Sequence, residues 1–107
     1  MVTYLVHYTV SHEAYPEYVE FLKNEHINDV MAVPGFLSAD LCLRKGGAME
    51  SSGKEIRVVY KVKDEDHIKA YISDFAMKLR EKSIEKFPGK FSSNREVWLD
   101  TITFASK

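Results

Sequence analysis

The residues best suited to chemistry are a histidine and an aspartate near the end of a helical pattern in the segment 24–36. Apolar residues recur there with the period of about 3.6 residues of an amphipathic helix, and His26 falls on that stripe one turn after Leu22. Asp29 follows three residues later, within reach of a side-chain contact. A carboxylate beside an imidazole raises its pKa and can fix its tautomer, whereas burial opposes the charge. His26 is therefore a candidate catalytic residue and Asp29 its candidate orienter, with a purely structural core histidine as the commoner alternative.

Three tyrosines are candidates for ligand binding. Tyr4 and Tyr8 point to one face of the first predicted strand, and Tyr60 lies on the third. A helix packed on this face would bring their hydroxyls close to His26. A histidine held by a carboxylate near phenols suits proton transfer on a small aromatic or carbonyl compound. Buried tyrosines also serve as amphipathic core fillers, and this structural explanation stays open.

The sequence predicts neither a metal site nor a cofactor site. No two of the four histidines have the spacing that places two metal ligands on one helix, and the sequence has no cysteine pair. The histidines are His7, His12, His26 and His67. Gly46-Gly47 lies between two strands rather than between a strand and a helix, so it is not a phosphate cradle. The lone Cys42 has no identifiable base beside it, and we expect a small buried residue there.

Three cationic residues gather around the second predicted helix and the loop that follows it. They are Arg80, Lys90 and Arg95. They could bind an acidic ligand, although such residues more often form a solvated rim. His12 and His67 lie in the first turns of the two predicted helices, and we expect both to be exposed.

Composition argues against several classes of partner. The 107 residues include 15 Lys and Arg and 16 Asp and Glu, and the formal charge of −1 gives no reason to expect nucleic acid or an anionic membrane. No apolar run approaches the ~20 residues needed to span a bilayer. The N-terminus lacks the basic region and cleavage site of a signal peptide. With a single cysteine and no sign of an oxidising compartment, we expect a cytoplasmic protein.

The order of strands and helices predicts a ferredoxin-like α+β fold. Period-2 runs predict strands near 3–10, 36–44, 55–62 and 94–104, and two helical stripes predict helices near 12–32 and 64–87. Pro34-Gly35 and Pro88-Gly89 end the two helices, and the glycine- and serine-rich segment 45–54 predicts a hairpin connection. The βαββαβ order, with right-handed crossovers, puts both helices on one face of a four-stranded antiparallel sheet in a single domain, 1–107.

The two faces of the predicted sheet differ in composition. The face expected under the helices is mainly apolar and comprises Tyr4, Val6, Tyr8, Leu37, Leu41, Leu43, Val58, Tyr60, Val97 and Leu99. The opposite face mixes polar residues with Leu5, Phe36, Val59, Trp98 and Ile102. A sheet face left in water seldom carries so many large apolar side chains. We therefore predict a homodimer that buries this face, with a monomer that has a semi-polar open face as the alternative.

Two parts of the chain resemble a family of small bacterial proteins that carries only a domain-of-unknown-function label. One is the helix end His26-Ile-x-x-Val30-Met-Ala with the following Gly35-Phe36-Leu-Ser-Ala. The other comprises Tyr71, Leu79-Arg80-Glu-Lys, Phe87-Pro-Gly-Lys-Phe91 and Arg95. The resemblance runs from about residue 4 to about residue 100, and the His26 segment and 87–91 are its most specific pieces.

That family is similar to a branch of the dimeric α/β-barrel superfamily. The resemblance implies a homodimer joined through its sheets, with a pocket between helices and sheet in each subunit. Relatives include antibiotic-synthesis and haem-degrading monooxygenases and muconolactone-isomerase-like, polyketide-cyclase-like and ether-degradation-type proteins, several with a histidine near the end of the first helix. Only His26 carries over to this chain. The haem-degrading branch resembles it less, because that branch has Asn on the first strand and Trp on the third, where this chain has His7 and 57–61.

Two classes of function follow. The first is binding of a small molecule in a helix–sheet pocket centred on His26, with acid/base or cofactor-independent oxygenase or isomerase chemistry as one form. Whether the protein is an enzyme therefore stays open. The second is a structural or interaction homodimer without a ligand. A roomy cavity beside His26 would favour the first class, and a space filled by Tyr and Phe side chains would favour the second.

Overall fold

A computed structural model of the protein describes residues 1–45 and 53–106. The strands are β1 (Val2–Val10), β2 (Phe36–Leu43), β3 (Lys54–Val62) and β4 (Phe91–Trp98). The helical elements are α1 (Tyr15–Phe21), the π-helical turn η1 (Leu22–His26), α2 (Ile27–Met31), α3 (Glu65–Asp74) and α4 (Ala76–Lys86). Most of the predicted connection 45–54, with Gly46-Gly47, lies outside the described residues. None of the helices formed by the described residues has the length and apolar character needed to cross a membrane.

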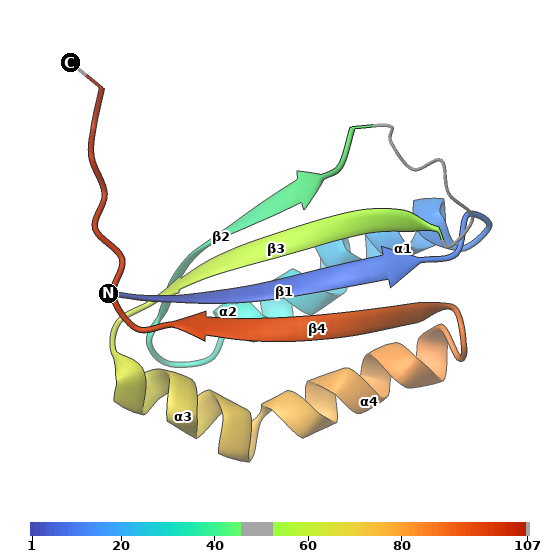
Figure 1. Ribbon diagram of the computed structural model, residues 1–107. Helices are drawn as coiled ribbons and strands as arrows, with labels where there is room; N and C mark the ends of the chain where they lie inside the picture. Colours follow the sequence, from blue (N-terminus) through green and yellow to red (C-terminus); the bar gives the residue numbers. More distant parts are fainter. Residues whose placement is uncertain (46–52, 107) are drawn as a thin grey trace.

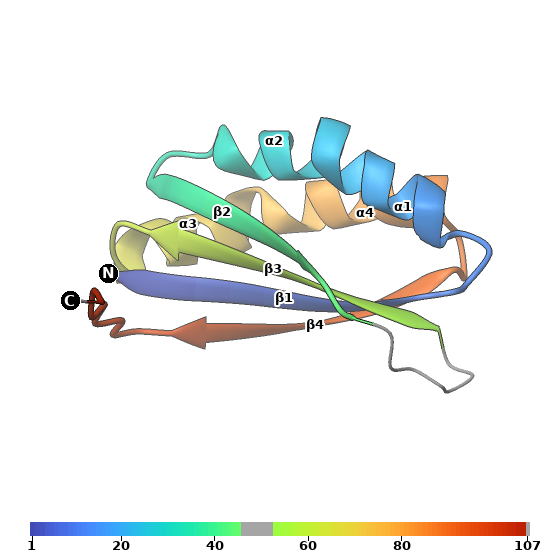
Figure 2. The same ribbon diagram turned by 90° about the horizontal axis from the view of Figure 1, so that it is seen from above.

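The four strands form one antiparallel sheet in the order β2-β3-β1-β4 (Figure 1). β1 lies inside the sheet, paired with β3 on one side and β4 on the other. Figure 2 shows that the helices all lie on one side of the sheet, and the opposite side carries none of them. This arrangement confirms the predicted ferredoxin-like α+β fold.

Both predicted helices are interrupted in the structure. The first begins at Tyr15 rather than near residue 12, with Pro16 in its first turn, where the missing N–H costs nothing. The second divides at Phe75, whose φ of −124° lies outside the helical region. Asp64 caps α3, because its carboxylate accepts a hydrogen bond from the backbone N–H of His67 at 3.0 Å. The helices are therefore built from shorter segments than periodicity alone predicts.

The predicted faces of β2 are wrong at the start of the strand because of a β-bulge. Phe36 is opposite Val62, whereas Ser38 pairs with Lys61, so Leu37 is an extra residue in the ladder. Phe36 consequently points toward the helices and is 7% exposed, whereas Leu37 is 53% exposed. Strict alternation from the middle of the strand predicts the reverse, because a shift of one residue exchanges the two faces.

The last strand begins and ends earlier than predicted. It spans Phe91–Trp98 rather than 94–104. The β1–β4 ladder ends where Trp98 pairs with Thr3, next to the start of β1 at Val2. Beyond it, Thr101 donates its backbone N–H to the carbonyl of Met1 at 3.1 Å, and its hydroxyl bonds to that of Thr3. Residues 99–106 have no regular structure. Leu99, predicted under the helices, is half-exposed, as is Leu43 at the end of β2.

The core between sheet and helices is rich in aromatic rings. One cluster comprises Tyr4, Phe36, Tyr60 and Tyr71, with ring centroids between 5.0 and 6.4 Å apart. A second surrounds Tyr18, whose ring lies 4.9 to 5.9 Å from those of Tyr8, Phe21, Phe87 and Phe91. Residues from both clusters line the cavity described below.

Candidate functional site

A π-helical turn keeps His26 directed at the core. In a regular α-helix, residues four apart advance about 400°, so the series Tyr18, Leu22, His26, Val30 would drift by about 120° over three steps. In η1 the backbone N–H of Ile27 instead bonds to the carbonyl of Leu22, five residues earlier. A π-turn holds about one residue more than an α-turn for the same rotation, so the side chains after it turn back toward their original direction. This removes most of the drift. All four residues of the series are therefore buried.

His26 is buried, as the helical stripe predicts, and only 8% exposed. Its ring lies 5.8 Å from the ring of Phe21, and its Nδ1 has no hydrogen-bond partner among the described residues. Burial lowers the pKa of His26; the carboxylate of Asp29 opposes this effect, and the positive charge of Lys82 adds to it. The imidazole is therefore neutral at pH 7, with one nitrogen that donates a hydrogen bond and one that accepts.

The carboxylate of Asp29 is held by α4 rather than by His26. It accepts a hydrogen bond from Lys82 Nζ at 3.0 Å. Glu25 joins the same group, 4.0 Å from Lys82 and 3.9 Å from Lys86. The predicted partner of His26 was either Asp29 or a tyrosine hydroxyl. Among residues 1–45 and 53–106, no hydrogen bond joins His26 to either of them. Asp29 thus acts on His26 through its electric field, and its role as an orienter stays a prediction.

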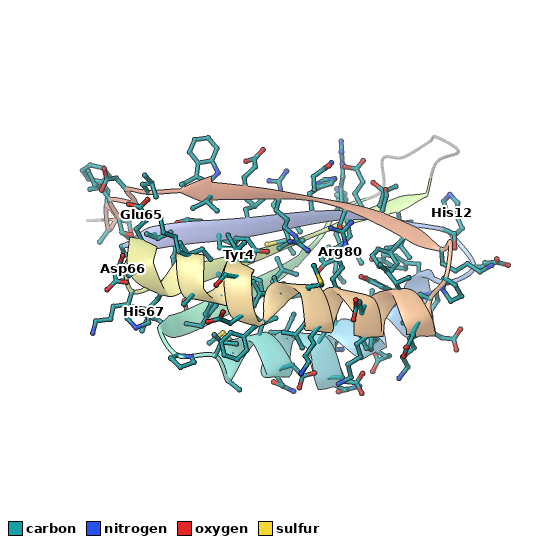
Figure 3. All side chains as sticks on the ribbon, turned by 90° about the horizontal axis from the view of Figure 1, so that it is seen from below. Tyr4, His12, Glu65, Asp66, His67 and Arg80 are labelled. Carbon is teal, nitrogen blue, oxygen red and sulfur yellow. The ribbon has the colours of Figure 1, made fainter. Side chains whose placement is uncertain are left out.

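One cavity brings His26 together with the three predicted tyrosines. Tyr4, Tyr8 and Tyr60 line it beside His26, and Figure 3 shows Tyr4 in the layer between the sheet and α3–α4. Burial raises the pKa of each of these tyrosines, so their hydroxyls keep their protons at neutral pH. The hydroxyl of Tyr60 is buried and, within the described ranges, has no hydrogen-bond partner.

The cavity also includes residues that the sequence analysis placed elsewhere or overlooked. The sequence analysis left Arg80 and Arg95 as either binders of an acidic ligand or part of a solvated rim. Both are exposed and line the cavity, and the buried Tyr71 lines it too. The position of Arg95 could have been predicted from the sequence. It lies two residues before Val97 in β4, and alternate residues of a strand share a face, so it belongs to the face that the helices cover. Tyr71 lies three residues after Ile68 on the apolar stripe of α3, a spacing that predicts burial.

The enclosed volume is small, at about 30 Å³. That exceeds the ~10–15 Å³ needed for one water molecule and is far below the roughly 300–1,000 Å³ of drug-sized ligand pockets. Side chains of Tyr and Phe take up most of the space between sheet and helices. Arg80 and Arg95 are exposed as well as lining, so movement of these two side chains would enlarge the space available to a ligand.

The remaining candidates lie away from this cavity. Cys42 is exposed, which corrects the expected small buried residue. His12 is exposed, as predicted, and Figure 3 shows it and His67 toward opposite ends of the molecule. His67 is half-buried rather than exposed, because its side chain packs against Gly35. Its Nδ1 lies 2.6 Å from the carboxylate of Asp64. Within the part of the chain that the structure describes, no three His, Cys, Asp or Glu side chains group as metal ligands would.

The fold is shared with solved structures of low sequence identity. An antibiotic-biosynthesis-monooxygenase-like protein of Bacillus cereus has a TM-score of 0.67 and 15% identity, over 98% of this chain and 97% of that one. The cofactor-independent oxygenase SnoaB of Streptomyces nogalater, as a mutant, has the same values. The heme-degrader MhuD of Mycobacterium tuberculosis, whose structure holds two hemes in its active site, has a TM-score of 0.67 and 15% identity, over 98% and 100%. This chain thus shares the ferredoxin-like α+β fold of these structures.

The sequence itself places the chain more closely. The model of the domain of unknown function DUF4286 matches residues 1–102, and the chain belongs to this family. None of the curated proteins matches the sequence. The resemblance noted from the two sequence segments is therefore confirmed at the level of the family.

The lowered pKa of His26 predicts a stability that falls as the pH falls. Below about pH 6.5, the unfolded chain binds a proton at His26 that the folded chain rejects, so acid favours unfolding. One such proton contributes up to about 1.4 kcal/mol per pH unit until the pH reaches the folded-state pKa. Urea unfolding at pH 7.5, 6.5 and 5.5 should show this loss, and His26→Gln should reduce it. The exposed His12→Gln is the matched control, and an equal slope in the wild type and His26→Gln would contradict the assignment.

Proposed function

We propose that this protein binds a small organic molecule in the cavity around His26. The supporting observation is a pair of buried polar atoms that line the cavity without a described partner, His26 Nδ1 and the hydroxyl of Tyr60. Buried polar atoms in native proteins nearly always have a hydrogen-bond partner, because an unsatisfied one loses its hydration without compensation. A bound molecule that offers a donor and an acceptor would satisfy both atoms.

The same arrangement suits proton transfer. A neutral imidazole can accept a proton from a carbon or hydroxyl group of the ligand, and protonated tyrosine hydroxyls can stabilise the oxyanion that this leaves. Acid/base chemistry of this kind is the first step of isomerisation, and it also suits a cofactor-independent oxygenase, the activity named for the structurally similar SnoaB. We propose His26 as the catalytic base, with Tyr4, Tyr8 and Tyr60 as ligand-binding residues and Asp29 as a more distant orienting charge.

A ligand screen with a His26 variant tests this function. Thermal melts of the wild type with small phenols, aromatic ketones and aromatic carboxylates should reveal compounds that raise the melting temperature by several degrees. His26→Ala should lose this response while it keeps most of its own stability, and His12→Ala should retain it. If no compound stabilises the wild type and His26→Ala unfolds more easily by about 1–3 kcal/mol, His26 is structural and the function fails.

A second candidate function is that of a structural or interaction homodimer without a ligand, and the small volume of the cavity favours it. We propose the homodimer in either case, with one domain per chain and the helix-free face of the sheet as its interface. That face carries Trp98, Leu5 and Val59, and Trp98 is 57% exposed in the isolated chain. Leu5 and Val59 are partly exposed beside it, and apolar side chains left open to solvent together on one face are typical of an association surface. The single cysteine and the charge of −1 support a cytoplasmic protein that binds no nucleic acid.

Replacement of Trp98 tests the dimer. Trp98→Glu places a charge in the proposed interface, where burial without a partner is costly, and should convert a dimer to a monomer at tens of micromolar protein. Met77→Glu is the matched control, because Met77 is an exposed apolar residue on α4, on the other side of the sheet. Sedimentation velocity gives the answer directly. A wild-type monomer at these concentrations, or a Trp98→Glu protein that remains dimeric, would contradict the proposed interface.

A further inference from the structure

We infer that the pocket around His26 takes a small organic carboxylate, with Arg95 and Arg80 binding the carboxylate group at the mouth. The inference rests on the proposed ligand-binding function and adds the chemical class of the ligand. Two guanidinium groups line the cavity, and the described lining residues include no Asp or Glu. Arginine is the residue best matched to a carboxylate, because its planar fork can donate two parallel hydrogen bonds.

The position of Arg95 is the first observation. It lies opposite Val6 in the ladder between β1 and β4, and so it shares the helix-covered face of the sheet with Tyr4 and Tyr8. A charged residue at such a position is unusual, because that face of a sheet is normally apolar. The Arg95 charge also lowers the pKa of Tyr4, Tyr8 and His26, in opposition to burial for the tyrosines and together with it for His26. Arg95 therefore places positive potential inside the aromatic site.

The second observation concerns the ion pairs around the two arginines. Among the described residues, neither Arg80 nor Arg95 makes an ion pair, whereas their neighbours Lys82 and Lys86 both do. Figure 3 shows Arg80 on α4 at the side that faces the sheet, near Tyr4. Two like charges on one small cavity repel each other, and an anion between them removes that repulsion.

The two buried polar atoms without a partner among the described residues, His26 Nδ1 and the Tyr60 hydroxyl, indicate the rest of the ligand. With its carboxylate at the arginines, a flat body can lie against the rings of Tyr4, Tyr8 and Tyr71. A polar atom at its far end would meet the Tyr60 hydroxyl or His26 Nδ1. The present volume of about 30 Å³ is smaller than such a ring, so binding requires the exposed side chains of Arg80 and Arg95 to move outward. The probe is therefore limited to a single ring, as in a hydroxylated aromatic acid.

Calorimetric titration of the full chain with 4-hydroxybenzoate and its neutral counterpart 4-hydroxybenzamide tests the inference. The acid should bind at least about tenfold more tightly than the amide, since each charge-assisted hydrogen bond contributes roughly ten- to hundredfold in affinity. Arg95→Gln and Arg80→Gln should each lower the affinity for the acid by about tenfold or more and leave that for the amide unchanged. Lys78→Gln, which removes an exposed positive charge from α4 outside the cavity lining, is the control and should change neither.

The other outcomes separate the carboxylate from the pocket itself. If the amide and other neutral aromatic compounds bind as tightly as the acid and His26→Ala abolishes their binding, the carboxylate is wrong and the pocket function stands. If Lys78→Gln weakens the binding of the acid as much as Arg95→Gln does, the affinity depends only on the overall positive charge of this region, and the two-arginine site is overturned. If neither acids nor neutral compounds bind, both proposals fail. Should Arg95→Gln not fold by circular dichroism, Arg95→Lys and Arg80→Gln decide the question.

Discussion

Phe36→Ala is expected to lower the free energy of unfolding by about 3–5 kcal/mol, the typical cost of removing a buried aromatic side chain. Phe36 is 7% exposed, and its ring lies 5.0 Å from that of Tyr71 and 5.6 Å from that of Tyr60. Deletion of the ring removes these contacts and leaves a cavity that the sheet and α3 cannot close completely. Urea unfolding followed by circular dichroism measures the loss.

The neighbouring residue is the matched control. Leu37→Ala changes an apolar side chain that is 53% exposed, so we expect a change of no more than about 0.5 kcal/mol. Both variants should be measured at two protein concentrations, since Leu37 is exposed and could contribute to a subunit contact. A larger loss for Leu37→Ala than for Phe36→Ala would show that strict alternation holds in β2 and that the bulge is absent.

Gly35→Ala is expected to destabilise the protein by about 2–5 kcal/mol. The φ of Gly35 is +90°, which costs a residue with a Cβ about 1–2 kcal/mol. A Cβ at Gly35 would also lie 2.4 Å from Cγ and 2.6 Å from Cβ of His67. His67 cannot easily move away, because its backbone N–H and its ring both bond to Asp64 at the cap of α3. Overpacking of this kind adds about 1–3 kcal/mol to the backbone strain.

Gly89→Ala separates these two contributions. Gly89 has a φ of +70°, but a Cβ there meets nothing within 4 Å. This variant should therefore show only the backbone strain, about 1–2 kcal/mol. The double variant Gly35→Ala, His67→Ala should recover part of the loss, because the clashing side chain is gone. Equal losses for Gly35→Ala and Gly89→Ala would mean that the contact with His67 carries no energy.

The elements of this fold and their order could be predicted from the sequence because their signals are local. The alternation of a strand and the apolar stripe of a helix both depend on residues only a few positions apart in the sequence. Pro34-Gly35 ends the first helical region, and Gly35 has the positive φ that a glycine allows. The burial of His26 was predictable for the same reason, since Leu22 and Val30 define the stripe around it.

The site itself depended on residues far apart in the chain. Asp29 bonds to Lys82, 53 positions away, and no local spacing favours that partner over His26. Arg95 joins His26 in one cavity only because β4 pairs with β1. The bulge that turns Phe36 inward and the end of β4 at Trp98 are likewise set by the neighbouring strands. Local periodicity determines which residues share a face of one element, but packing between elements decides which faces meet, because contacts across the core do not depend on sequence spacing.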